Sequence, residues 1–184
     1  MSGLQAAGGT AITISWSRAS KKHIGIAAAI ALLGVLVDFG TKVAALAWLE
    51  PGNFIPLLGG LLILRLTRNS GAAFSMGESF TPVFTCFAIA ALCVILCWLL
   101  PKVRHVGWAV TTGLLLAGIS GNLFDRLFRE PGPFRGEVID FIQLPYFAIF
   151  NVADICITAA AVLVIWLSVI RQVSPGGASL RQDA

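Results

Sequence analysis

The sequence predicts an all-α membrane protein with four transmembrane helices, a small extracytoplasmic β-sheet and an extracytoplasmic loop or short helix. Three observations lead to this fold class. Only 12% of the 184 residues are charged and 57% are hydrophobic, whereas about 25% of the residues in a soluble domain are charged. The mean hydropathy is +0.87. Four segments contain the roughly 20 mostly apolar residues that a helix needs to cross a bilayer.

The four spans are expected at 24–49, 80–100, 106–124 and 147–170. The first contains two charged residues, and the second contains none. The third ends where Asp125 follows Phe124, and the fourth has one carboxylate near its start. Their lengths suit one compact bundle, so we expect a single domain.

That domain covers residues 21–172, and two long connections between its spans form its outer part. The connection 51–79 contains a run of leucine, isoleucine and threonine that is typical of a strand, and Pro-Gly and Gly-Gly pairs punctuate it. We therefore expect a small sheet there. The second connection includes the loop 127–137. Mobile cytoplasmic tails are expected at residues 1–20 and 173–184.

The charged residues set the expected orientation. Basic residues are slightly more frequent on the side of the membrane that holds both termini, which favours a cytoplasmic location for that side. We therefore expect both long connections at the outer face of a bacterial cell membrane, with membrane lipid around the spans. The basic residues do not cluster on one face as in a nucleic-acid-binding protein, so we expect no nucleic acid partner.

The cysteine and histidine content argues against a metal centre. The four cysteines lie inside two spans, without a CxxC motif or a Cys/His cluster, and are interpreted as small apolar packing residues. The two histidines, His23 and His105, are expected at the cytoplasmic ends of spans. We therefore expect neither a zinc site nor a Ser/His hydrolase at the outer face.

Charged residues inside a span are costly and need an explanation. Asp38 and Lys42 lie four residues apart and share a helix face. They are either a neutralising pair that faces the bundle or groups on the substrate side. Asn122, Asp125 and Arg126 follow small residues at the end of the third span. They form either a helix contact with a capped end or a polar site where the helix leaves the membrane.

Two further carboxylates point to a reaction. Asn151 and Asp154 lie three residues apart in the fourth span, and Asp140 lies in an apolar stretch that enters the same interface. Two carboxylates in a poorly solvated site share one proton, which raises one pKa. Such a pair suits peptide hydrolysis, because one group takes a proton from water while the other polarises the scissile carbonyl. A purely structural role for Asp154 stays open.

These residues belong to motifs that resemble those of the bacterial lipoprotein signal peptidases, also called type II or prolipoprotein signal peptidases, the aspartyl peptidase family A8. The resemblance covers about residues 24–170. Its motifs, in chain order, are Asp38-x-x-x-Lys42, Arg68-Asn69-x-Gly71-Ala72-Ala73-Phe74, Gly118-x-x-Gly121-Asn122-x-x-Asp125-Arg126, Val138-Ile139-Asp140-Phe141 and Phe150-Asn151-Val152-Ala153-Asp154.

The resemblance implies an intramembrane aspartyl endopeptidase that needs no cofactor and uses Asp140 and Asp154 as its catalytic pair. Its substrates are prolipoproteins with a diacylglyceryl-modified lipobox cysteine, and it cuts before that cysteine. Cyclic peptides of the globomycin type inhibit the family. We expect a monomer. The residues expected to support the pair or bind substrate are Asn69, Gly71, Asn122, Arg126, Asn151, Asp125, Arg68, Asp38 and Lys42.

Two other classes of protein were weighed against the peptidase. A small four-helix proton-coupled transporter would use a membrane carboxylate such as Asp154, with polar groups at mid-membrane and a dimeric assembly. A non-catalytic scaffold or chaperone would leave the clustered carboxylates unexplained. The polar residues of this chain gather at the outer interface, which favours the peptidase.

Overall fold

The computed structural model describes residues 21–71 and 80–179. The predicted tail 1–20, the motif residues 72–74 and the last five residues therefore lie outside the described part. The four spans are α1 (Lys21–Trp48), α2 (Thr81–Val94) with its continuations η4 (Ile95–Leu99) and η5 (Leu100–Lys102), α3 (Val106–Phe128), and α4 (Val152–Ile165) with its continuation η6 (Trp166–Ile170). All four are long and apolar enough to cross a membrane.

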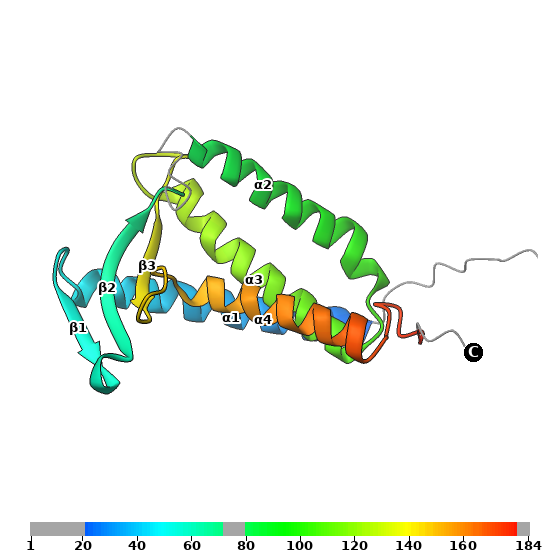
Figure 1. The fold of residues 1–184 in the computed structure, drawn as a ribbon. Helices are drawn as coiled ribbons and strands as arrows, with labels where there is room; N and C mark the ends of the chain where they lie inside the picture. Colours follow the sequence, from blue (N-terminus) through cyan, green and yellow to red (C-terminus); the bar gives the residue numbers. More distant parts are fainter. Residues whose placement is uncertain (1–20, 72–79, 180–184) are drawn as a thin grey trace, which may run out of the picture.

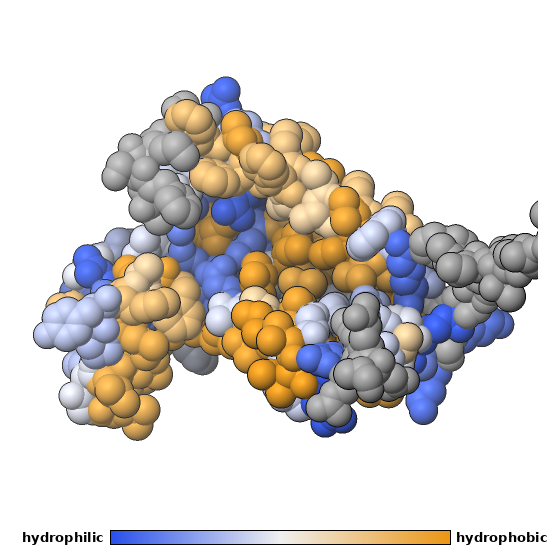
Figure 2. Space-filling view, turned by 45° about the vertical axis from the view of Figure 1, so that its right-hand side comes forward, coloured by the Kyte–Doolittle hydropathy of each residue, from blue (hydrophilic) through white to orange (hydrophobic). Residues whose placement is uncertain are grey.

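The central span is α3, which packs extensively against α1 and α4 (Figure 1). Its most apolar window is 61% buried, whereas the corresponding windows of the other spans are between 11% and 22% buried. α2 packs mainly against α3, and less extensively than α1 or α4 does. Hydrophobic surface therefore covers much of the outside of the bundle (Figure 2), as expected where lipid is the solvent.

Small residues allow the backbones of the helices to approach closely. A Cβ atom on Gly113 of α3 would lie 2.8 Å from the carbonyl oxygen of Ala27 on α1. A Cβ atom on Gly118 would overlap the carbonyl oxygen of Ala153 on α4. The glycines of α3 thus permit its contacts with both neighbours.

A three-stranded antiparallel sheet in the order β1-β2-β3 lies across one end of the bundle, which we call the sheet end (Figure 1). Its strands are β1 (Phe54–Leu57), β2 (Leu62–Asn69) and β3 (Val138–Gln143), and the short helix η1 (Leu58–Gly60) joins the first two. The small sheet expected in the connection 51–79 is confirmed by β1 and β2. The third strand was not predicted, although its valine, isoleucine and phenylalanine residues are typical of strands.

Two predicted span boundaries were wrong. α3 continues to Phe128 instead of ending at 124, because Asp125 inside the helix forms an ion pair with Arg129 one turn later. The charges at this end are thus satisfied within the protein. α4 begins at Val152 instead of 147, because the chain before it pairs with β3: the N–H of Phe150 donates to the carbonyl oxygen of Ile142 at 2.8 Å.

Two segments tie the ends of the spans together. At the sheet end, the hydroxyl of Thr81 on α2 donates to the carbonyl oxygen of Ser70 at 2.6 Å. At the opposite end, residues 173–179 form a turn that accepts hydrogen bonds from the indole of Trp108 and the backbone of Arg104. This turn is the first part of the predicted mobile tail 173–184, and the mobility of that tail stays a prediction.

Candidate active site

Asp140 and Asp154 reach the same place from two different elements. Asp140 lies in β3, opposite Thr67 of β2, and Asp154 lies in the first turn of α4. The two elements adjoin because Phe150, just before α4, exchanges backbone hydrogen bonds with Ile142 of β3 at 2.8 and 2.9 Å. The chain therefore returns to β3 immediately before the helix that carries the second carboxylate.

Asn151 links the two carboxylates directly. Its side chain is fully buried, and its Nδ2 donates to Asp140 Oδ1 at 2.6 Å. Its backbone N–H donates to Asp154 Oδ2 at 3.2 Å, while its Oδ1 accepts from the backbone N–H of Asp154 at 3.0 Å. The latter two bonds form a capping box at the start of α4. Asp154 therefore also performs the structural role that the sequence left open.

The second oxygen of Asp140 is held from β2. Asn69 Nδ2 donates to Asp140 Oδ2 at 2.8 Å, and the backbone N–H of Gly71 donates to Asn69 Oδ1 at 2.8 Å. Gly71 has a φ of +94°, which favours glycine. Its N–H fixes the amide of Asn69 so that the NH₂ group faces the carboxylate. Arg68 is exposed, and strand alternation places it on the opposite face.

Asn122 connects Asp154 to two other elements. Its Nδ2 donates to Asp154 Oδ1 at 2.8 Å. Its Oδ1 accepts from Asn151 Nδ2 at 3.0 Å and from Lys42 Nζ at 3.1 Å. One buried amide on α3 thus contacts the catalytic candidate on α4, the helix cap and a lysine on α1.

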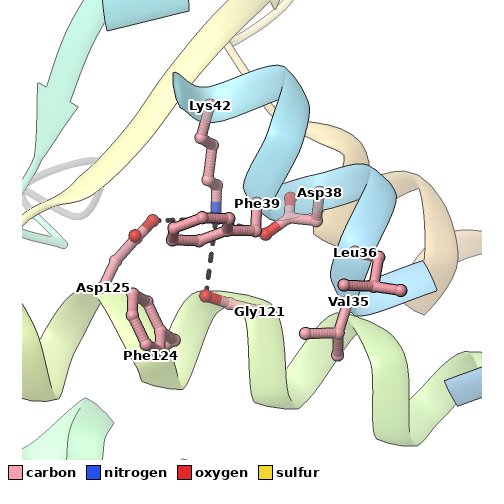
Figure 3. Close-up of a pocket in the computed structure, with 8 residues that line it drawn as sticks. All are labelled: Val35, Leu36, Asp38, Phe39, Lys42, Gly121, Phe124 and Asp125. Carbon is pink, nitrogen blue, oxygen red and sulfur yellow. Dashed lines mark hydrogen bonds and ion pairs between the residues drawn. The ribbon is translucent and has the colours of Figure 1, made fainter. Parts of the chain in front are cut away.

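A buried group of charges lies beside these amides. Lys42 Nζ is 2.8 Å from Asp38 Oδ2 and 2.8 Å from Asp125 Oδ2 (Figure 3). Arg129 Nε lies 2.5 Å from the other oxygen of Asp125. We call these four residues the Lys42 cluster. A role for Arg129 was not predicted from the sequence, although its spacing of four residues from Asp125 is typical of a helical ion pair.

Arg126 lies on α3, close enough to the carboxylate pair to interact with it electrostatically. The charges of Asp154, Asp140 and Asp125 all act on its guanidinium group. Its Nη1 donates to the carbonyl oxygen of Asn122 at 3.3 Å. Its Nε is buried and has no hydrogen-bond partner among the residues that the structure describes. Within the described residues, this buried donor is therefore unsatisfied.

Burial, together with the nearby charge of Asp154, raises the pKa of Asp140 to about 6. The hydrogen bonds from Asn69 and Asn151 and the charge of Lys42 act in the opposite direction. Asp140 therefore takes up a proton much closer to neutrality than an ordinary aspartate does. That property is required of one member of a pair that shares a proton.

An apolar groove of about 630 Å³ leads to Asp154. The residues that line it are Phe147, Phe150, Asp154, Ile155, Thr158, Ala159, Val162 and Leu163. In the space-filling view, hydrophilic surface gathers at the sheet end of the hollow beneath α2, and hydrophobic surface forms the rest of that hollow (Figure 2). The groove can hold an apolar chain with one of its polar bonds beside Asp154.

No group of three or more His, Cys, Asp or Glu side chains is placed to hold a metal ion within 21–71 and 80–179. The reactive groups of the described site are carboxyl, amide, ammonium and guanidinium groups. Together they can exchange protons with a bound substrate and donate hydrogen bonds to its oxygen atoms.

The sequence is similar to a family of peptidases and to individual proteins named after the same activity. The family model described as "Signal peptidase (SPase) II", Peptidase A8, matches residues 30–170. The lipoprotein signal peptidase of Streptomyces coelicolor is 43% identical over 157 residues, which cover 85% of this chain and 76% of the relative. That of Mycobacterium avium is 41% identical over 140 residues, which cover 76% of each chain.

The fold is also similar to solved structures. One is described as a bacterial membrane enzyme structure determined by the in meso method at 1.9 Å resolution. It superposes with a TM-score of 0.72 at 26% sequence identity, and the match covers 83% of this chain and 97% of that one. A second bacterial membrane enzyme, at 2.3 Å resolution, gives a TM-score of 0.66 at 27% identity over 81% of this chain and 90% of that one.

Proposed function

The chain belongs to the signal peptidase II family, Peptidase A8, and we propose that Asp140 and Asp154 are the two carboxyl groups with which it cuts the signal peptide. The protein is an aspartic peptidase that removes signal peptides from prolipoproteins. Its four apolar helices and its family make it a multi-pass membrane protein. None of these relatives supports the transporter.

One observation carries the assignment of the pair: Asn151 donates hydrogen bonds to both carboxylates at once. Asp140 is 2% exposed and has a pKa raised to about 6, whereas Asp154 borders the groove. We therefore assign the buried member, Asp140, as the proton donor to the carbonyl oxygen and the groove-facing member, Asp154, as the base that activates water.

The reaction follows from these two roles. Asp154 takes a proton from water as the water oxygen bonds to the scissile carbonyl carbon, and Asp140 gives its proton to the carbonyl oxygen. The product is a neutral tetrahedral diol. Asp154 then gives its proton to the amide nitrogen, the C–N bond breaks, and Asp140 recovers a proton from the diol. Both carboxyl groups return to their starting states.

Arg126 supports this sequence by stabilising the developing charge on the carbonyl oxygen. Its unsatisfied Nε and its electrostatic interaction with both aspartates support a role as a hydrogen-bond donor to the substrate. Donors that are already in place when the charge develops lower the barrier without having to reorganise. Asn69 and Asn122 hold the carboxylates, and neither needs to contact the substrate.

The groove indicates how the substrate binds. Its apolar lining suits the hydrophobic signal peptide and the diacylglyceryl group of the lipobox cysteine, so the substrate enters sideways from the bilayer and is cut before that cysteine. The sheet end then lies at the outer face of the cytoplasmic membrane, with both termini in the cytoplasm. A monomer suffices, and cyclic peptides of the globomycin type inhibit by occupying the same groove.

A gel-shift assay tests the pair. Purified protein in detergent is mixed with a diacylglyceryl-modified prolipoprotein, beside the Asp140→Asn and Asp154→Asn variants and the unlipidated substrate. We expect cleavage by the wild type alone, and only of the lipidated substrate. Lys102→Met, a change at the opposite end of α2, is the control and should cleave normally. Cleavage by either folded Asn variant would contradict the assignment.

A further inference from the structure

Two aspartates outside the proposed catalytic pair hold the backbone next to it. Asp38 Oδ1 accepts from the N–H of Ala153 at 2.8 Å, and Ala153 directly precedes Asp154. Asp125 Oδ2 accepts from the N–H of Ile139 at 3.2 Å, and Ile139 directly precedes Asp140. Each proposed catalytic aspartate therefore follows a residue whose backbone is anchored to a buried carboxylate.

Lys42 joins the two anchors. Its ammonium lies between Asp38 on α1 and Asp125 on α3, at 2.8 Å from each (Figure 3). It also donates to Asn122 Oδ1 at 3.1 Å. An ammonium group has three N–H donors, and these three acceptors are its nearest, while the carbonyl oxygen of Gly121 lies farther away, at 3.5 Å (Figure 3). Lys42 itself is 1% exposed.

The contact between Lys42 and Asn122 fixes the orientation of the Asn122 amide. Because Asn122 Oδ1 faces the ammonium of Lys42, its Nδ2 faces Asp154 and donates to it. The reversed amide would place NH₂ against the ammonium and an oxygen against the carboxylate, and both contacts would be repulsive. A pair that served only to neutralise charge inside the bundle would need no contact with this amide.

We propose that Lys42 is a positioning residue that sets the separation and orientation of Asp140 and Asp154 through Asp38, Asp125 and Asn122. The proposal rests on the proposed function, which makes these two aspartates the catalytic pair. Three chains of contacts connect the ammonium to the pair. Asp38 leads to the backbone of α4, Asp125 leads to the backbone of β3, and Asn122 leads to the carboxylate of Asp154. No substrate needs to touch Lys42.

Steady-state kinetics on the lipidated prolipoprotein give the first test. Lys42→Met keeps an unbranched side chain, one heavy atom shorter than that of lysine, and removes its three donors. We expect kcat to fall by about 100-fold, as for a misplacement of reacting groups by about 1 Å, and KM to stay within about threefold because the groove is intact. Lys42→Arg retains donors to the carboxylates and should keep more of kcat than Lys42→Met. Lys102→Met is the matched control.

The pH dependence separates positioning from simple packing. The charged groups that face Asp140 are Asp154 on α4, Arg126 on α3 and Lys42 on α1. The charge of Lys42 lowers the pKa of Asp140, so its removal should raise that pKa and move the limb of the kcat/KM pH profile that reports Asp140 to higher pH in Lys42→Met. The NMR signals of ¹³Cγ-labelled aspartate should show the same shift without any turnover.

The outcomes separate this proposal from the proposed function. A folded Lys42→Met variant with wild-type kcat and an unmoved pH profile overturns the positioning role, while loss of cleavage in Asp140→Asn still supports the pair. Cleavage by Asp140→Asn overturns the pair, and the positioning role falls with it. If Lys42→Met does not fold, Lys42→Met with Asp38→Asn replaces it, since this double variant removes one cation and one anion. Normal kcat in that variant equally overturns the role of Lys42.

Discussion

At the scale of single residues, the site depends on side-chain amides that are each held in one orientation, with the NH₂ group and the oxygen facing different partners. Asn69, Asn122 and Asn151 each present NH₂ to a carboxylate of the proposed pair. In each amide the oxygen is occupied by another donor: the backbone of Gly71, the ammonium of Lys42 or the backbone of Asp154. The carboxylates therefore meet donors that are already oriented, which keeps the cost of reorganisation during the reaction low.

Two substitutions of Asn151 separate its capping of α4 from its hydrogen bond to Asp140. Asn151→Ser keeps a side-chain oxygen that can cap α4 but removes the NH₂ donor to Asp140. We expect cleavage to fall by at least about tenfold, because a hydrogen bond to a charged group contributes about 1.5–3 kcal/mol. Asn151→Ala removes both interactions and should also destabilise the fold by about 1 kcal/mol more than Asn151→Ser.

Gel-shift rates and thermal unfolding in detergent measure these two effects. If Asn151→Ser cleaves at the wild-type rate, the hydrogen bond to Asp140 has no part in catalysis. If the two variants have equal stability, the capping box contributes nothing measurable to α4.

The sequence contained the polar residues that meet here, but not their contacts. Asp140, Asp154, Asn122 and Asn151 were chosen because polar groups inside apolar runs need an explanation. Asn69 and Asp140 are 71 positions apart, so the amide orientation of Asn69 depends on strand pairing that no local pattern encodes. The roles of these residues stay predictions, and their assembly into one network is a finding of the structure.

At the scale of elements, α3 determines how closely the other spans approach. Gly118→Ala would place a Cβ atom against the backbone of Ala153 and within 2.5 Å of Ile157 on α4. We expect a loss of about 1–3 kcal/mol in unfolding free energy, as for other overpacked cores, together with slower cleavage because α4 carries Asp154.

Gly40→Ala is the matched control, since a Cβ atom there meets nothing within 4 Å. It should leave cleavage unchanged and stabilise α1 by up to about 1 kcal/mol. Thermal unfolding in detergent compares the two variants. Equal stability would show that α3 and α4 can separate to accommodate the added methyl group at little cost.

Elements were predictable where one signal extended over many residues. Runs of about 20 apolar residues located all four spans, and the leucine-rich stretch before Thr67 located β2. The predicted bounds were wrong where a tertiary contact determines the residue at which a helix begins or ends. An ion pair between Asp125 and Arg129 extends α3, and pairing with β3 delays the start of α4. β3 itself is short and needs β2 as a partner, so its sequence alone is ambiguous.

At the scale of the whole molecule, we expect the apolar groove to position the substrate for the carboxylate pair at the sheet end. Thr158→Trp would fill the groove that leads to Asp154. We expect KM for the lipidated prolipoprotein to rise by at least about tenfold, equivalent to about 1.4 kcal/mol of binding, with little change in unfolding temperature.

Val169→Trp is the comparison, because Val169 is 62% exposed and does not line the groove. It adds the same bulk to the same span at a distance from the site. Steady-state kinetics distinguish the two variants. An unchanged KM in Thr158→Trp would place the bound signal peptide elsewhere on the protein.

The light packing of α2 has a consequence for the range of substrates. α2 is tied to the sheet end through Thr81, yet it packs on α3 less extensively than the other spans do. Because few contacts hold α2 to α3, we expect α2 to move relative to α3 at little cost, so that the hollow beneath it can admit signal peptides of different bulk. We therefore expect the enzyme to process many different prolipoproteins. The chemistry at the scissile bond should decide which of them are cut, and the shape of the signal peptide should matter little.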